Sequence, residues 1–214
     1  MVPEPFVSSQ NRNRRGVAKH VSASGVLVMG LTLKEIPREF GGEWGGTVSL
    51  RVELAMPIRV RPVTNGDIAA MAALRAEEWE TEAFWEARIG RYLRGEHSPQ
   101  QALPARAAFV AEDEDNGTVV GFVSGHRTRR YGCDGELQWM NVARAHRGRG
   151  TAGRLLETIA DWFVQQELRR VCVNVDPKNV PARRLFAKYG AQPLNDHWMV
   201  WLDARRMGVR SKDD

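Results

Sequence analysis

The chain has 214 residues, of which 43% are hydrophobic and 27% charged, values typical of globular proteins and far from those of disordered or fibrous ones. This length allows one well-packed domain with an appendage and excludes two ordinary domains with separate cores. The net charge is +5, and residues 127–154, with seven arginines and two acidic residues, carry an equal excess by themselves. That concentration favours a local anionic ligand and predicts no nucleic-acid partner.

The cysteines and the apolar runs indicate the cellular compartment and whether a metal or a membrane is involved. Cys133 and Cys172 belong to no C-x-x-C motif and have no histidine cluster nearby, so the sequence predicts neither a disulfide framework nor a metal site. A reducing, cytoplasmic location is expected. The longest apolar run, 25–33, follows several basic residues like a signal peptide, but no cleavage site follows it. It is also shorter than the roughly 20 residues of a bilayer span, so no membrane partner is expected.

Residues 1–57 differ from the rest of the chain. They are rich in Gly, Asn and Arg, with short strand-like pieces such as 47–54 and little apolar periodicity. We expect a poorly ordered or non-native N-terminal extension. The alternative is an appendage that docks on the sheet or mediates dimerisation, so monomer and homodimer both stay open. At the other end, 204–214 is expected to be a C-terminal tail after a domain at 58–203.

A globular pattern begins at Met56. Residues 58–62 alternate like an edge strand, and Thr64 or Asp67 is expected to cap a helix. The apolar face of that helix is formed by Ile68, Met71, Leu74 and Trp79. A second helix is predicted over about 81–94, and Pro99 and Pro104 are expected to end it and open a loop.

The middle of the chain predicts an antiparallel meander. Strand patterns cover 106–113, 118–128 and 135–142, with tight-turn dipeptides at 116–117 and 134–135. The apolar spacing of 155–163 then predicts a helix on the sheet. A buried strand at 170–176, a helix at 179–190 and a closing strand at 197–203 complete a mixed α/β domain.

Between the third meander strand and its helix, 147–153 read RGRGTAG and contain two phosphate-binding patterns. Gly148, Gly150 and Gly153 match the dinucleotide fingerprint G-x-G-x-x-G, which would indicate an oxidoreductase. Three features count against this dinucleotide interpretation. Five residues separate the fingerprint from the strand, three antiparallel strands precede it, and too little chain follows it for a doubly wound domain. The alternative pattern, R-x-x-G-x-A, is formed by Arg147, Gly150 and Ala152 and is typical of a coenzyme A pyrophosphate loop.

The coenzyme A interpretation has a physical basis. A loop that turns into a helix presents unpaired N–H groups, and the helix dipole adds positive charge there. Glycine lets a pyrophosphate approach the backbone where a Cβ would stand. Arg144, His146, Arg147 and Arg149 surround this loop and suit a further nucleotide phosphate.

From Ile58 to Asp203 the chain resembles the GNAT superfamily of acyl-CoA-dependent N-acetyltransferases. The matching stretches are LQWMNVARAHRGRGTAGRLLE at 137–157 and VNVDPKNVPARRLFAKYGA at 173–191. The resemblance implies a mixed, mostly antiparallel sheet with helices on both faces and a splayed central strand pair. It also implies acetyl-CoA as cosubstrate, no metal, and transfer of the acetyl group to a primary amine of a small molecule or peptide by direct attack in a ternary complex.

The resemblance also implies roles for individual residues. Asn141 and Val142 would pair their backbone with the pantetheine arm, and Asn179 would contact that arm or simply cap its helix. The cofactor-binding residues expected in this way are Asn141, Val142, Arg147, Gly148, Arg149, Gly150, Thr151, Ala152, Gly153 and Asn179.

For the chemistry, Glu136 stands six residues before Val142, where related enzymes place a catalytic base. Strand alternation would put it on the same face as Gln138, Met140 and Val142. The usual acidic tyrosine is replaced by Phe186, so Tyr189 is the candidate acid, with water as the alternative. A coenzyme A-binding sensor or interaction module without turnover is the alternative function.

The acceptor is expected beside the two early helices. Acidic and aromatic side chains there form a plausible wall for a cationic amine, and a solvated helix face is the alternative. These residues are Glu77, Glu78, Trp79, Glu80, Glu82, Phe84, Trp85 and Glu86.

Overall fold

The computed structural model describes residues 19–21, 27–29 and 57–209. The chain divides into two compact units, 1–55 and 56–214. In the first unit, β1 (Lys19–Val21) and β2 (Leu27–Met29) form a short antiparallel pair. The remainder of the expected N-terminal extension, including the strand-like piece at 47–54, lies outside the described residues.

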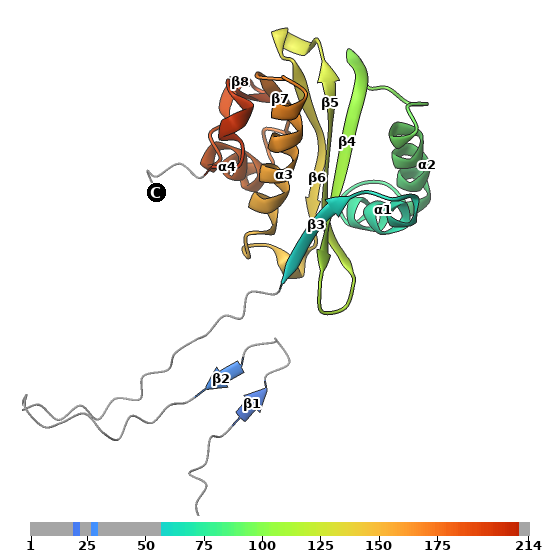
Figure 1. The fold of residues 1–214 in the computed structure, drawn as a ribbon, viewed down its shortest axis with the longest axis vertical. Helices are drawn as coiled ribbons and strands as arrows, with labels where there is room; N and C mark the ends of the chain where they lie inside the picture. Colours follow the sequence, from blue (N-terminus) through green and yellow to red (C-terminus); the bar gives the residue numbers. More distant parts are fainter. Residues whose placement is uncertain (1–18, 22–26, 30–56, 210–214) are drawn as a thin grey trace, which may run out of the picture. The chain divides into compact units, whose positions relative to one another are not determined.

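The second unit is built on a seven-stranded sheet of order β3-β4-β5-β6-β7-β9-β8 (Figure 1). Neighbouring strands are antiparallel except β6 and β7, which are parallel. The strands are β3 (Ile58–Pro62), β4 (Ala102–Asp113), β5 (Val119–Thr128), β6 (Gly135–Val142), β7 (Val171–Asn174), β8 (Gln192–Asn195) and β9 (Trp198–Trp201).

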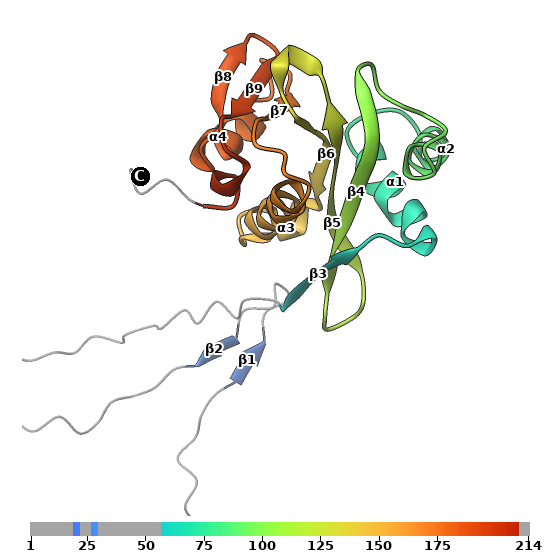
Figure 2. The ribbon, with the colours of Figure 1, turned by 45° about the horizontal axis from the view of Figure 1, so that its top comes forward.

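Helices cover both faces of this sheet, as Figures 1 and 2 show. One face carries α1 (Ile68–Ala76) and α2 (Glu82–Leu93), and the other carries α3 (Thr151–Gln165) and α4 (Val180–Lys188). Two apolar clusters fill the space between the layers, one under α1 and α2 and a larger one under α3 and α4. The mixed, mostly antiparallel fold expected from the sequence is therefore confirmed.

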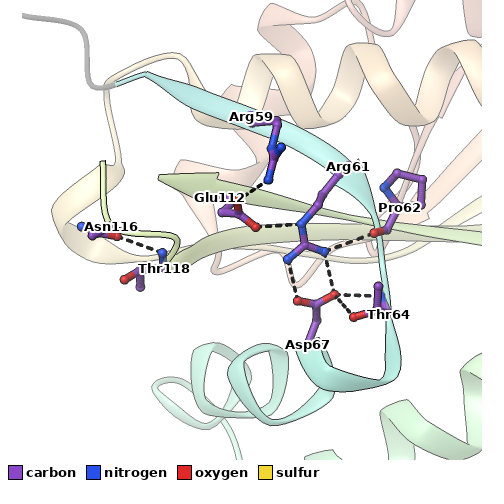
Figure 3. A network of polar contacts seen from close by, with 8 residues as sticks. All are labelled: Arg59, Arg61, Pro62, Thr64, Asp67, Glu112, Asn116 and Thr118. Atoms are coloured by element: carbon purple, nitrogen blue, oxygen red, sulfur yellow. Dashed lines mark hydrogen bonds and ion pairs between the residues drawn. The ribbon is translucent and has the colours of Figure 1, made fainter. Parts of the chain in front are cut away.

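An ion-pair network, drawn in Figure 3, stabilises the start of the domain. Arg61 on β3 donates through Nη1 and Nη2 to the Asp67 carboxylate, 2.8 Å each, and through Nε to Glu112 Oε2 at 2.7 Å. Asp67 also accepts from the backbone N of Thr64. The hydrogen bond from Arg61 lowers the pKa of Asp67 to about 2. This network fixes the turn from β3 into α1.

Several boundaries differ from those expected. Pro104 lies inside β4, at a register shift between Leu103 and Arg106, and the predicted loop there is wrong. Trp79 lies beyond the end of α1 and is 53% exposed, because the helix ends at Ala76. Ala204 and Met207, from the expected tail, are fully buried in the larger core.

Candidate functional site

The central strands β6 and β7 pair only over three residues and then separate. The register joins Gly135 to Val171, Glu136 to Cys172 and Leu137 to Val173. Past Leu137, β6 continues to Val142 along β5, with no further pairing to β7. The splayed pair expected from the sequence is thus present, and it opens toward the glycine-rich loop.

A cavity of about 420 Å³ occupies this opening. Its wall combines the second half of β6, the loop before α3, and α4. The lining residues are Glu78, Met140, Asn141, Val142, His146, Arg147, Gly148, Gly150, Ala152, Gly153, Asn179, Pro181, Ala182, Leu185, Phe186, Lys188 and Tyr189. Eight of the ten residues expected to bind the cofactor line it, whereas Arg149 is exposed outside this lining and Thr151 is buried beneath it.

The loop has the geometry that a bound phosphate needs. Gly148 and Gly150 have φ of 77° and 86°, a left-handed conformation that residues with a Cβ rarely adopt. A Cβ at either position would meet open space, so their requirement is conformational. Gly150 is the N-cap of the 15-residue helix α3, which directs unpaired N–H groups and the positive end of the helix dipole at the cavity. These residues fit a pyrophosphate.

At position 153, glycine is required because there is no space for a Cβ. A Cβ there would collide with Tyr189 Oη and lie 2.9 Å from Tyr189 Cζ. The first turn of α3 is therefore in direct contact with the ring that follows α4. Tyr189 is only 6% exposed, yet it lines the cavity.

Arg147 connects the loop to two other elements. Its Nε donates to the Val142 carbonyl at 2.8 Å, and its Nη2 donates to Glu78 Oε1 at 2.8 Å. Glu78 follows α1 and was expected among the acceptor residues, not beside the glycine-rich loop. Its contact with Arg147 brings the α1–α2 connection to the cavity wall.

Two asparagines of the site have structural partners. Asn179 accepts from Ala182 N at 3.1 Å and so caps α4, while it also lines the cavity. Asn141 accepts from Arg75 Nη1 at 3.2 Å, which turns its side chain toward α1. Both residues therefore line the cavity while their side chains have hydrogen-bond partners within the fold.

A β-bulge at Gln138 changes which face of β6 carries Glu136. Ser124 pairs with Trp139, and the next β5 residue, Gly125, pairs with Leu137, so Gln138 has no partner. Glu136 consequently shares the α1–α2 face with Trp139 and Asn141. The expectation that it shares a face with Met140 and Val142 is wrong, because the extra residue reverses the alternation.

Glu136 is 4% exposed and surrounded by polar groups. Its Oε2 accepts from Arg130 Nε at 3.0 Å and from Thr128 Oγ1 at 3.2 Å, and His126 Nε2 lies 3.7 Å away. Burial is the largest influence and would raise the pKa of Glu136, but His126 and Arg130 together outweigh it and hold that pKa below its usual value. Glu136 does not line the cavity.

Arg130 and His126 were not singled out from the sequence. Arg130 belongs to the short helix η2 (Arg130–Gly132), and its guanidinium also stacks on Trp198, 4.6 Å from the ring centroid. His126 is a buried histidine on β5. Strand alternation would have shown that His126 faces the helices, but not that it reaches Glu136, because the β5–β6 register depends on the bulge.

A splayed strand pair with a glycine-rich loop at the start of the following helix is the arrangement that the resemblance stated above implies. The model of the acetyltransferase (GNAT) family matches residues 65–191, more than half of the chain. The chain therefore belongs to the GNAT acetyltransferase family, and the recognition made from the sequence is confirmed.

Two curated relatives match part of the chain. An uncharacterized N-acetyltransferase, YobR, of Bacillus subtilis is 26% identical over 110 residues, which are 50% of this chain and 41% of that protein. Streptothricin acetyltransferase of Escherichia coli is 25% identical over 104 residues, 44% of this chain and 60% of that protein. The matched part spans less than two thirds of either relative.

Solved structures share the fold. An N-acetyltransferase from Staphylococcus aureus Mu50 has a TM-score of 0.53 at 17% identity, covering 69% of this chain and 99% of that one. Spermidine N-acetyltransferase SpeG from Vibrio cholerae has a TM-score of 0.53 at 16% identity, covering 70% and 96%. The NatC complex bound to Gag peptide and CoA has a TM-score of 0.52 at 16% identity, covering 69% and 99%.

Within the described ranges, no group of three or more His, Cys, Asp or Glu residues is placed to hold a metal ion. Among those same residues, no helix combines the length and apolar character needed to cross a membrane.

Proposed function

We propose that this protein transfers an acetyl group from acetyl-CoA to a primary amine of a small molecule or peptide, by direct attack in a ternary complex. The observation that carries the proposal is the cavity that joins the free edge of β6 to the N-terminus of α3. A strand edge can pair with the amide groups of an extended arm, and a helix N-terminus can hold its phosphates. The two features lie in one cavity.

The cofactor would be held by the chain as follows. Backbone groups of Asn141 and Val142 pair with the pantetheine arm, which requires Arg147 to release the Val142 carbonyl that it now binds. Gly148 and Gly150 let the pyrophosphate reach the backbone N–H groups at the start of α3. Ala152, Gly153 and Asn179 complete the wall. Arg149 and the backbone of Thr151 belong to the same loop, and acetyl-CoA supplies the activated acyl group.

Glu136 and Tyr189 are the proposed catalytic pair. Glu136 takes the proton of the attacking amine, directly or through a water molecule. Tyr189 donates a proton to the leaving thiolate, and its position in the cavity wall beside Gly153 supports this role. A backbone N–H of β6 near Met140 would stabilise the negative charge that develops on the thioester oxygen.

The acceptor amine would enter beside the connection between α1 and α2. Glu78 lines the cavity, and Trp79 and Phe84 are exposed at 53% and 44%, which leaves acidic and aromatic groups available to an ammonium ion. The name of the solved relative SpeG gives spermidine, a cationic amine, as its acceptor. We place the reaction in the cytoplasm, in keeping with two buried cysteines that are free thiols.

One experiment tests the proposal. Full-length protein is titrated calorimetrically with acetyl-CoA and with NAD, and thiol release is then measured on a panel of polyamines, aminoglycoside-like amines and peptide N-termini. We expect binding of acetyl-CoA, no binding of NAD, and release of thiol with at least one amine. Binding without turnover on any amine would instead favour a coenzyme A sensor, for which the phenylalanine at 186 provides a reason. Binding of NAD alone would overturn the coenzyme A interpretation.

A further inference from the structure

Arg147 joins two parts of the cavity wall that belong to different ligands of the proposed reaction. Its Nε donates at 2.8 Å to the carbonyl of Val142, on the edge of β6 where the cofactor arm is expected. Its Nη2 donates at 2.8 Å to Oε1 of Glu78, in the connection between α1 and α2 where the acceptor is expected. One guanidinium therefore occupies a group that the cofactor needs and a group that the amine needs.

Glu78 is the carboxylate that an incoming ammonium group would meet in this cavity. Of the described residues that line the cavity, it is the only acidic one. In the free protein its charge is compensated by the guanidinium of Arg147. This compensation weakens the attraction that the carboxylate would otherwise exert on a cationic acceptor. The acceptor subsite is thus incomplete as long as the ion pair persists.

The ion pair between Arg147 and Glu78 is exposed enough to rearrange. The two side chains are 48% and 31% exposed, and ion pairs that water reaches in this way are weak. Phosphate groups bind a guanidinium more strongly, through charge-assisted and often bidentate hydrogen bonds. Arg147 immediately precedes the loop that turns into α3 at Gly150, so phosphates bound there would lie beside it. They would compete with Glu78 for the same cation.

We propose that Arg147 couples the two subsites: the phosphates of acetyl-CoA draw its guanidinium away from Glu78, and the released carboxylate then binds the ammonium group of the acceptor. This inference rests on the proposed acetyl transfer and assigns Glu78 as the acceptor-binding residue. The same movement frees the carbonyl of Val142 for the cofactor arm. Because such coupling is reciprocal, any change that loosens Glu78 from Arg147 also favours the cofactor.

Arg75, a second cation close to Glu78, does not take the place of Arg147. Its Nη1 donates to Asn141 Oδ1 at 3.2 Å, and its guanidinium stacks on Trp85, 4.5 Å from the ring centroid. These contacts hold Arg75 against the layer formed by α1 and α2. The carboxylate released from Arg147 therefore stays available to a ligand in the cavity.

The coupling is tested first with acetyl-CoA alone, by calorimetric titration of the full chain. Glu78→Gln removes the group that competes for Arg147, so the affinity for acetyl-CoA should rise by roughly two- to five-fold, the range that a partly exposed ion pair supports. In the Arg147→Met background the same substitution should give no such gain. Glu114→Gln is the control for a lost negative charge, because Glu114 is exposed and follows Asp113, whose carboxylate lies 3.9 Å from His146 of the same loop.

The acceptor side is tested with the amine that the panel identifies. That amine should bind several-fold more tightly to protein saturated with CoA, which carries the same phosphates and no acetyl group to transfer, than to the free protein. Arg147→Met should abolish this difference. In Glu78→Gln the KM for the amine should rise several-fold while kcat changes little, because the carboxylate binds the ammonium group and takes no part in bond breaking.

The outcomes separate the two proposals. If the wild-type protein binds no acetyl-CoA or turns over no amine, the proposed acetyl transfer falls and the coupling falls with it. Turnover together with a gain that is absent in Glu78→Gln, equal in Glu114→Gln, or retained in Arg147→Met overturns the coupling alone. An unchanged KM in Glu78→Gln overturns the assignment of the acceptor-binding residue. Both side chains of the ion pair are partly exposed, so these variants should fold, and melting temperatures verify it.

Discussion

Arg130 Nε donates to Glu136 Oε2 at 3.0 Å, and the same guanidinium stacks on Trp198 and donates through Nη2 to the Gln100 carbonyl. The ion pair is part-buried and held by η2 over the face of the sheet that carries α1 and α2. It therefore controls the charge of Glu136, the proposed base, from outside the cavity.

Replacing Arg130 should move the pH dependence of turnover. In Arg130→Gln the cation that favours the ionised carboxylate is lost, so the pKa of Glu136 rises. The acidic limb of the kcat/KM profile should therefore shift to higher pH. Arg129→Gln, at an exposed neighbour, is the control for lost charge. An unshifted acidic limb in Arg130→Gln would remove Glu136 from the rate profile.

Tyr189→Phe tests the proposed acid. Removing the hydroxyl should lower kcat by roughly 100- to 10,000-fold, because general acid catalysis contributes at this level, while the affinity for acetyl-CoA stays the same. Steady-state kinetics with a slow-leaving and a fast-leaving thioester distinguish the roles. A loss that disappears with the better leaving group supports proton donation, whereas equal losses mean that Tyr189 acts by packing on α3.

Gly150 should not tolerate an acidic side chain. Its φ of 86° makes every other residue strained, but asparagine adopts this conformation more readily than most. Gly150→Asn should retain measurable binding of acetyl-CoA, while Gly150→Glu should abolish it, because a carboxylate would stand where the pyrophosphate is expected. Calorimetric titration of both variants gives the comparison. Equal binding by the two would contradict the location of the phosphates.

The contact between Gly153 and Tyr189 predicts that alanine at position 153 lowers the stability of the protein, although alanine usually favours a helix. Gly153→Ala should destabilise the protein by about 1–3 kcal/mol, since overpacking outweighs the gain in helix propensity. Gly90→Ala, whose Cβ would meet the flexible end of Arg94 at 3.1 Å, should be neutral or stabilising. Urea unfolding measures both. Tyr189→Phe combined with Gly153→Ala should recover part of the loss, and simple additivity would show that the two residues do not interact.

The network at Asp67 predicts a loss of stability in acid. Its pKa is lowered to about 2 by Arg61, so its contribution is present above the unfolded-state pKa of about 4 and is lost as pH falls from 4 toward 2. Asp67→Asn should cost at most about 2 kcal/mol at pH 7. The difference in free energy of unfolding between this variant and wild type should shrink near pH 2. Urea unfolding of both proteins across this pH range measures it, and a difference that stayed constant would contradict the prediction.

Much of the fold follows from local sequence rules. The apolar spacing of 155–163 gave helix α3 its buried face, and the Asn116-Gly117 dipeptide marked the turn between β4 and β5, where Asn116 Oδ1 accepts from Thr118 N. The loop at 147–153 was located by its glycines, and the resemblance of its flanking stretches indicated the family. These features are encoded within a few residues of each other, so one sequence suffices to recognise them.

Other features depend on tertiary contacts and were missed. Strand β8 has a polar, largely exposed sequence with a proline, and only its pairing with β9 makes it a strand. The need for glycine at 153 comes from a tyrosine 36 positions away. The cluster of Glu136, Arg130 and His126 requires the β5–β6 register, which a pattern of alternation cannot supply.

The bulge at Gln138 divides β6 into two segments in which opposite sets of positions face the helices α1 and α2. Before it, even-numbered positions point to the helices α1 and α2; after it, odd-numbered positions do. Deleting Gln138 would exchange the faces of the residues before it and keep the orientation of the residues after it that line the cavity. Glu136 would then face the core around Phe163, and Leu137 would leave that core. Because a buried carboxylate without partners is costly, the single bulged residue is needed for the stability of the sheet as well as for the position of Glu136.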